Sequence, residues 1–169
     1  MIKIFVGDIS KPKTEAIVNP SNKYGLMSRG ISLVLSDYAG KVIEREAKEL
    51  IKKNNSPFEI GKFYITGSSR LKRRGIKKIY HAVISDFPGG LVSLDAISKS
   101  MKSILEFAKN DDINSIAFPA LGSGLGELPK EIIIPLMADI LLSYNNILDI
   151  SVVDANEDFV EQFKKRVNG

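Results

Sequence analysis

The chain has 169 residues, of which 44% are hydrophobic and 26% charged, as expected for one soluble globular domain spanning residues 1–169. It has no cysteine and one histidine, which excludes disulfides, thiolate chemistry and a histidine-rich metal site, and no cofactor is implied. The net charge of +4 permits an anionic partner without identifying one. No run is long enough to cross a bilayer and the start has no signal-peptide pattern, so we expect a cytoplasmic protein with no membrane partner.

Strands and helices are predicted to alternate along most of the chain. The expected elements are strands over residues 1–6 and 16–18, helices over 31–38 and 41–53, strands over 62–66 and 78–84, a helix over 92–108, a strand over 115–121, a helix over 130–142, a strand over 149–153 and a helix that Asn156 caps and that runs to about Val167. Pro135 predicts a late start or a kink in its helix. The alternation indicates an α/β fold, a three-layer α/β/α sandwich with a mixed, mostly parallel central sheet.

Polar or glycine-rich segments follow several of the predicted strands. Residues 19–22 come after the second strand, and a glycine-rich turn from Gly122 to Gly126 follows the strand over 115–121. A strand that ends in such a turn before a helix is typical of a phosphate site, because glycines let backbone N–H groups approach an anion. The turn lacks the lysine of a P-loop. The alternative is a flexible connection with no ligand.

Five segments in register resemble the macro domains, a family that binds ADP-ribose. They are residues 6–10 (VGDIS), residues 16–22 (AIVNPSN), Gly61 with Thr66-Gly67, residues 80–83 (YHAV) and residues 116–126 (IAFPALGSGLG). The likeness runs from the first strand nearly to the C-terminus and is greatest to the compact, stand-alone prokaryotic type. It implies a cleft for ADP-ribose or a derivative at the carboxyl ends of the strands, with ADP-ribosylated protein as a further partner.

The resemblance assigns the two ends of the ligand. Asp8 corresponds to the carboxylate that accepts a hydrogen bond from the adenine amino group, with the Ile9 backbone beside it. Asn22 corresponds to the asparagine that contacts the distal ribose, whereas Asn19 is expected to be structural. The alternative for Asp8 is a capping residue, and for both asparagines it is a residue that orders a loop.

Two loops and a strand end complete the implied site. The residues assigned to ligand binding there are Ser28, Arg29, Gly30 and Ile31, then Gly122, Ser123, Gly124, Leu125 and Gly126, and finally Ala155 and Asn156. The family usually has three glycines where this chain has Ser28-Arg29-Gly30, so Arg29 either narrows the pocket, pairs with a phosphate or is a solvated surface residue. Gly126 stands where many members carry an aromatic residue, and we expect it to leave that side open.

Hydrolysis of ADP-ribosyl adducts is an alternative to binding. Such an enzyme would be an ADP-ribosyl hydrolase, acting on O-acetyl-ADP-ribose or mono-ADP-ribosylated protein, or an ADP-ribose-1''-phosphate phosphatase, with Asn22 as the candidate catalytic residue. No acidic residue follows Ile31 before Asp37, and His81 lies in an apolar strand, where we interpret it as a core residue. We therefore rank binding above catalysis.

A second alternative is polyanion binding through the basic segment from Arg70 to Lys78. It contains Arg70, Lys72, Arg73, Arg74, Lys77 and Lys78. RNA and poly(ADP-ribose) would both be attracted to it. No aromatic RNA-binding pattern accompanies the segment, and we favour a solvated loop over a nucleic-acid partner.

Overall fold

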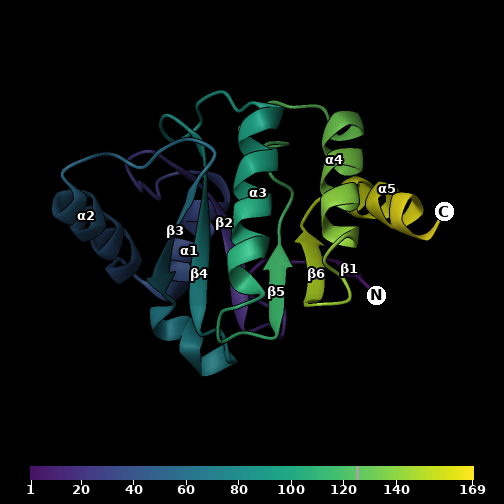
Figure 1. Cartoon of the computed structure of the whole chain (residues 1–169), viewed down its shortest axis with the longest axis horizontal. Helices are drawn as coiled ribbons and strands as arrows, with labels where there is room; N and C mark the ends of the chain where they lie inside the picture. The colour runs from purple at the N-terminus through teal and green to yellow at the C-terminus, as the bar shows by residue number, and fades with distance from the viewer. Residues whose placement is uncertain (125) are drawn as a thin grey trace.

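The computed structural model describes residues 1–124 and 126–169 as a six-stranded sheet flanked by helices (Figure 1). The strands are β1 Lys3–Val6, β2 Ala16–Asn22, β3 Phe63–Gly67, β4 Lys78–Ser85, β5 Ser115–Phe118 and β6 Asp149–Asp154. The helices are α1 Gly30–Ala39, α2 Val42–Asn54, α3 Leu94–Ala108, α4 Lys130–Leu142, α5 Glu157–Asn168 and the 3₁₀ helix η1 Ser69–Arg74. The strand order is β1-β6-β5-β2-β4-β3, parallel throughout except for the antiparallel pair β3 and β4.

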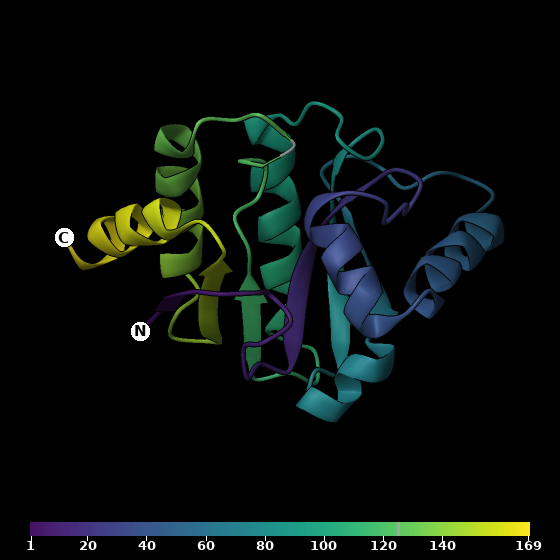
Figure 2. The ribbon, with the colours of Figure 1, turned by 180° about the vertical axis from the view of Figure 1, so that it is seen from behind.

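Helices cover both faces of this sheet. α3, α4 and α5 bury their apolar sides in the larger core on one face, and α1, η1 and the start of α2 pack on the other (Figures 1 and 2). The predicted three-layer sandwich with a mixed, mostly parallel sheet is therefore confirmed. None of the described helices is both long and apolar enough for a membrane span.

Strand β2 is longer than the sequence predicted. The polar residues expected beyond its end belong to it, because the ladder to β4 continues to the pair Asn22–Ser85 with a bulge after Ser21. Pro20 is tolerated there because β5 pairs with β2 only at Ala16 and Ile17, so the proline needs no donor on the β5 side. The end of β2 thus carries alternating polar side chains into the region where the sheet opens.

Several other boundaries differ from prediction by one to three residues, whereas α4 has the predicted bounds. β5 ends at Phe118 because Pro119 cannot continue the ladder, and β1 begins at Lys3. α4 begins at Lys130 and runs through Pro135, so a late start was wrong. Proline has no N–H, so Pro135 cannot donate the helical hydrogen bond to the Glu131 carbonyl. Glu131 is exposed, so water can donate to this carbonyl instead.

A directed chain of buried hydrogen bonds crosses the sheet from α1 to β3. Ser32 Oγ donates to Asn19 Oδ1 (3.0 Å), and Asn19 Nδ2 lies 3.0 Å from His81 Nδ1. Because the amide can only donate, His81 carries its proton on Nε2 and donates it to Thr66 Oγ1 (2.8 Å), which donates to the Gly67 carbonyl (3.0 Å). His81 is therefore a satisfied structural residue, as predicted, and it is neutral, since complete burial lowers its pKa to about 3.

This burial predicts an acid-sensitive fold. Unfolded histidine has a pKa near 6.5, so between about pH 6.5 and 3 the unfolded chain binds a proton that the native protein does not. The free energy of unfolding should therefore fall by about 2 kcal/mol from pH 7 to pH 5 through His81 alone. Urea unfolding of wild type and His81→Gln at both pH values should show a smaller loss in the variant. Parallel losses, or an NMR titration of the native His81 ring above pH 5, would contradict this.

Candidate functional site

Two adjoining pockets form a cleft at the carboxyl ends of the parallel strands. We call them the Asp8 pocket, of about 370 Å³, and the Asn22 pocket, of about 250 Å³. Both are lined by Ile31, Ala120 and Gly124, so they lie next to each other. Ile31 comes from the first turn of α1 and Gly124 from the loop after β5, so these two loops face each other across the cleft.

Most residues predicted for the site lie in this cleft. Asp8, Ile9, Ser123, Ala155 and Asn156 line the Asp8 pocket, Asn22, Arg29, Gly30, Gly122 and Gly126 line the Asn22 pocket, and Ile31 and Gly124 line both. Ser28 is exposed and lines neither pocket. Leu125 lies outside the described residues.

Asp8 lies just beyond the end of β1 and forms part of the wall of the Asp8 pocket. Its Oδ1 accepts a hydrogen bond from the Ser10 amide (2.8 Å), which fixes the turn, and Ile9 is buried in the core on the α1 side of the sheet. Within the described chain, this turn bond engages only one carboxylate oxygen. Asp8 is therefore a capping residue, as the alternative held, and it also presents a carboxylate edge to the cleft.

The structure adds Asp154 to this wall, a residue that the sequence analysis missed. Its Oδ2 accepts from the Ala120 amide (3.2 Å) and its Oδ1 from the Asn156 amide (2.9 Å), so it joins the ends of β5 and β6. Asn156 in turn caps α5, accepting from the Phe159 amide at 3.0 Å. An aspartate directly between a strand and a capped helix is the signal that could have identified it.

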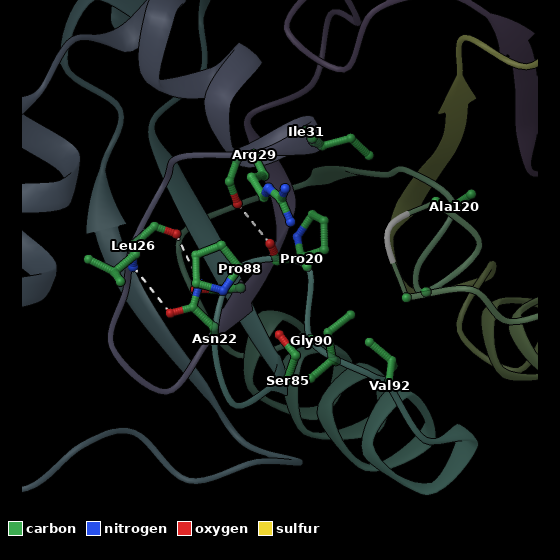
Figure 3. A pocket seen from close by; sticks show the side chains of 18 residues that line it. Pro20, Asn22, Leu26, Arg29, Ile31, Ser85, Pro88, Gly90, Val92 and Ala120 are labelled. Carbon is green, nitrogen blue, oxygen red and sulfur yellow. Dashed lines mark hydrogen bonds between the residues drawn. The ribbon is translucent and has the colours of Figure 1, made fainter.

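Asn22 orders the turn that follows β2. Its Oδ1 accepts from the amides of Tyr24 (3.1 Å) and Leu26 (3.2 Å), and its Nδ2 donates to the Leu26 carbonyl at 2.9 Å (Figure 3). The side chain is almost fully buried at 3% exposure. Both amide atoms are thus engaged in loop structure while the residue lines the Asn22 pocket.

The first turn of α1 forms one rim of the Asn22 pocket. Gly30 has a φ of +56°, which favours glycine, and Arg29 occupies the N-cap position without a side-chain capping bond. Ser32 fixes this turn to β2, because its Oγ lies 2.8 Å from the Pro20 carbonyl and 3.0 Å from Asn19 Oδ1 and shares its single proton between them. The helix begins without an acidic side chain, so the N–H groups of its first turn give this rim a positive potential.

The glycine-rich loop after β5 forms the opposite rim, and its glycines differ in role. Gly122 has a φ of +79°, and a Cβ there would lie 2.8 Å from Ile97 Cδ1. A Cβ on Gly126 would lie 2.8 Å from both the Gly122 carbonyl oxygen and Val92 Cγ2, so this position has no room for a side chain. Gly124 is outside the left-handed region, and its Cβ would meet nothing within 4 Å.

A third loop, between β4 and α3, was not predicted to take part. Four of its residues line the Asn22 pocket, Pro88, Gly89, Gly90 and Val92, together with Ser85 at the end of β4 (Figure 3). The sequence Pro88-Gly89-Gly90 shortly after a strand is the same kind of signal that identified the other loops. Across the described chain, no group of three or more histidine or acidic side chains could hold a metal ion.

The basic segment lies at the opposite end of the strands from the cleft. It contains η1 and leads into Lys78, which pairs with Ala16 at the start of β2. Much of its charge is used internally: Lys77 pairs with Glu15 (2.9 Å) and Lys78 with Asp111 (2.8 Å). Arg74 donates to the Ser10 carbonyl at 3.0 Å and stacks over Tyr38, with its guanidinium carbon 5.1 Å from the ring centre.

Comparison with known proteins identifies the fold family. The family model for the macro domain matches residues 18–137. The chain belongs to the macro domain family. An uncharacterized protein of Aquifex aeolicus is 30% identical over 166 residues, which is 97% of this chain and 96% of that protein.

Two solved macrodomains share the fold. One is a mutant of the Oceanobacillus iheyensis macrodomain with ADPR, with a TM-score of 0.85, 21% identity and coverage of 96% of this chain and 89% of that one. The other is the Trypanosoma brucei macrodomain in complex with ADP-ribose, with a TM-score of 0.79, 23% identity and coverage of 98% and 68%.

Proposed function

We propose that this macro domain binds ADP-ribose, free or attached to protein, in the cleft formed by the Asp8 and Asn22 pockets. The observation that carries the proposal is that the two pockets adjoin between the first turn of α1 and the loop after β5, both of which line each pocket. Backbone N–H groups of a helix start and of a glycine-rich turn suit a diphosphate. The complexes of two macrodomains of the same fold with ADPR and ADP-ribose support the choice of ligand.

In this proposal the ligand runs from Asp8 to Asn22. Adenine lies in the Asp8 pocket, where a carboxylate can accept from its amino group. The diphosphate lies near Gly124, which lines both pockets, and the distal ribose lies in the Asn22 pocket. No aromatic side chain is among the described residues that line the Asp8 pocket, so adenine is held there without stacking on a ring.

Base selectivity tests the adenine end. ADP-ribose should bind more tightly than its guanine counterpart, and Asp8→Ala should weaken it by about 1–3 kcal/mol, as for a charge-assisted hydrogen bond. In Asp8→Asn an oxygen remains to accept from the Ser10 amide, but the negative charge is lost. This variant therefore distinguishes the role of Asp8 in the turn from its role in base recognition. Calorimetric titration measures all three proteins, and equal affinities in wild type and both variants would rule out this assignment.

The glycine loop gives the sharpest test of the diphosphate position. Gly124→Val should fold normally, because its Cβ enters open space, but the added methyl groups should remove measurable ADP-ribose binding. AMP, with one phosphate, should lose less. Gly122→Val is the contrasting variant and should lower the melting temperature, because both its φ and its clash with Ile97 disfavour a side chain. A folded Gly124→Val protein with wild-type affinity would show that the loop only connects β5 to α4 and does not bind the diphosphate.

Hydrolysis should be weak or absent. Among the described residues that line the Asn22 pocket there is no carboxylate, histidine, lysine or tyrosine that could act as a general base beside the distal ribose. Asp37 is exposed on α1 and lines neither pocket. We expect a mono-ADP-ribosylated acceptor peptide to be bound without turnover. Release of labelled ADP-ribose at about 1 per second or faster, lost in Asn22→Ala, would instead establish an enzyme.

A further inference from the structure

The charges along the cleft are arranged with opposite signs at its two ends. The carboxylates that line it, Asp8 and Asp154, are both in the Asp8 pocket. Arg29 lines the Asn22 pocket and is the only cationic side chain among the described lining residues of either pocket. A ligand placed along the cleft therefore meets a cation at the end that is proposed to hold its distal half.

The Arg29 side chain extends across the Asn22 pocket and lies against Gly89. It projects from the N-terminus of α1 toward the loop between β4 and α3, where a Cβ on Gly89 would lie 2.6 Å from Arg29 Nη1 (Figure 3). Gly89 has a φ of +76°. Both this φ and the short distance to Arg29 favour a glycine at this position. The guanidinium thus lies against the backbone of Gly89, which has no side chain. Arg29 therefore extends from the start of α1 to the loop between β4 and α3.

The guanidinium is also available to a ligand. Within the described chain, Arg29 makes no ion pair and its side chain donates no hydrogen bond, whereas Arg74 and Arg166 are both engaged by other residues. A guanidinium has five N–H donors in a fork that matches the oxygens of a phosphate. Its charge adds to the positive end of α1, whose first turn lines the same pocket.

We propose that Arg29 determines specificity by charge. It makes the Asn22 end of the cleft favour adenosine diphosphates whose second phosphate is unesterified over those whose second phosphate is esterified to a neutral sugar. The inference rests on the proposed function for the position of the ligand. The same side chain narrows the space for a distal ribose, so charge and size select in the same direction.

The test compares three probes, ADP-ribose, ADP and inorganic pyrophosphate, by calorimetric titration at pH 8 and low salt. At this pH the terminal phosphate of ADP is dianionic, so the diphosphate of ADP carries one more negative charge than the diphosphate of ADP-ribose. The readout is the ratio of the ADP-ribose to the ADP dissociation constant. Arg29→Gln should lower it by about tenfold, and pyrophosphate binding should weaken with it. Arg29→Lys should retain most of the ratio.

Arg73→Gln is the matched control. It removes the same charge from an exposed arginine of η1, which lines neither pocket, and it should leave the ratio and all three affinities unchanged. Circular dichroism melts should be alike for all the proteins, because Arg29 is exposed.

The remaining outcomes distinguish charge selection by Arg29 from the proposed binding of ADP-ribose. An equal loss of ADP and ADP-ribose affinity in Arg29→Gln, or tighter ADP-ribose binding with ADP unchanged, would overturn charge selection, while the proposed function would stand. Wild type that binds pyrophosphate in an Arg29-dependent way but neither nucleotide would overturn the proposed function and support the anion site. Failure to bind any of the three probes would overturn both.

Discussion

The hydrogen-bond chain that begins at Ser32 sets the position of α1, and the cleft depends on that position. Four donors point the same way, from Ser32 through Asn19 and His81 to Thr66, so the side chains of these four residues satisfy one another between α1 and β3. Because a buried polar group without a partner costs about 1–3 kcal/mol, the layer strongly favours one arrangement of these elements. The first turn of α1 is thereby held against β2, and its N–H groups line the Asn22 pocket.

The cleft itself arises where two parallel strands part. β5 stops at Phe118, whereas β2 continues to Asn22 along β4, so the sheet opens between them at its carboxyl end. Open α/β sheets place ligands at such positions because loops, and not side-chain layers, form the walls. Here the walls are the start of α1, the glycine-rich loop after β5 and the loop after β4. Asp154 fixes the second of these by binding the Ala120 amide.

Much of this could be predicted from the sequence, because the signals were local. Apolar periodicity and the cap at Asn156 located α1 to α5, although not the 3₁₀ helix η1, and glycines after an apolar strand located the loop at Gly122–Gly126. The family resemblance placed Asp8 and Asn22 in one cleft. The extent of β2 could not be predicted, because a polar sequence that contains Pro20 joins the ladder only when β4 is already beside it and β5 is not.

The roles of single side chains were harder to predict for the same reason. The space for a side chain at Gly126 is limited by Val92, and Arg29 lies beside Gly89; both Val92 and Gly89 lie on a loop distant in sequence. Ser28 and Arg29 are neighbours in the chain, yet only Arg29 reaches the cleft. A pattern along the chain contains no information about such contacts until the sheet order is known.

The pairing of β1 with β6 has a consequence for the order in which the site can be assembled during synthesis. Lys3 pairs with Ser151, and within the described chain β6 is the only strand beside β1. The segment that carries Asp8 therefore has to wait, without a strand partner, until almost the whole chain has left the ribosome. β2, α1 and β4 are made much earlier, so the Asn22 end of the cleft can become ordered while the Asp8 end is still incomplete.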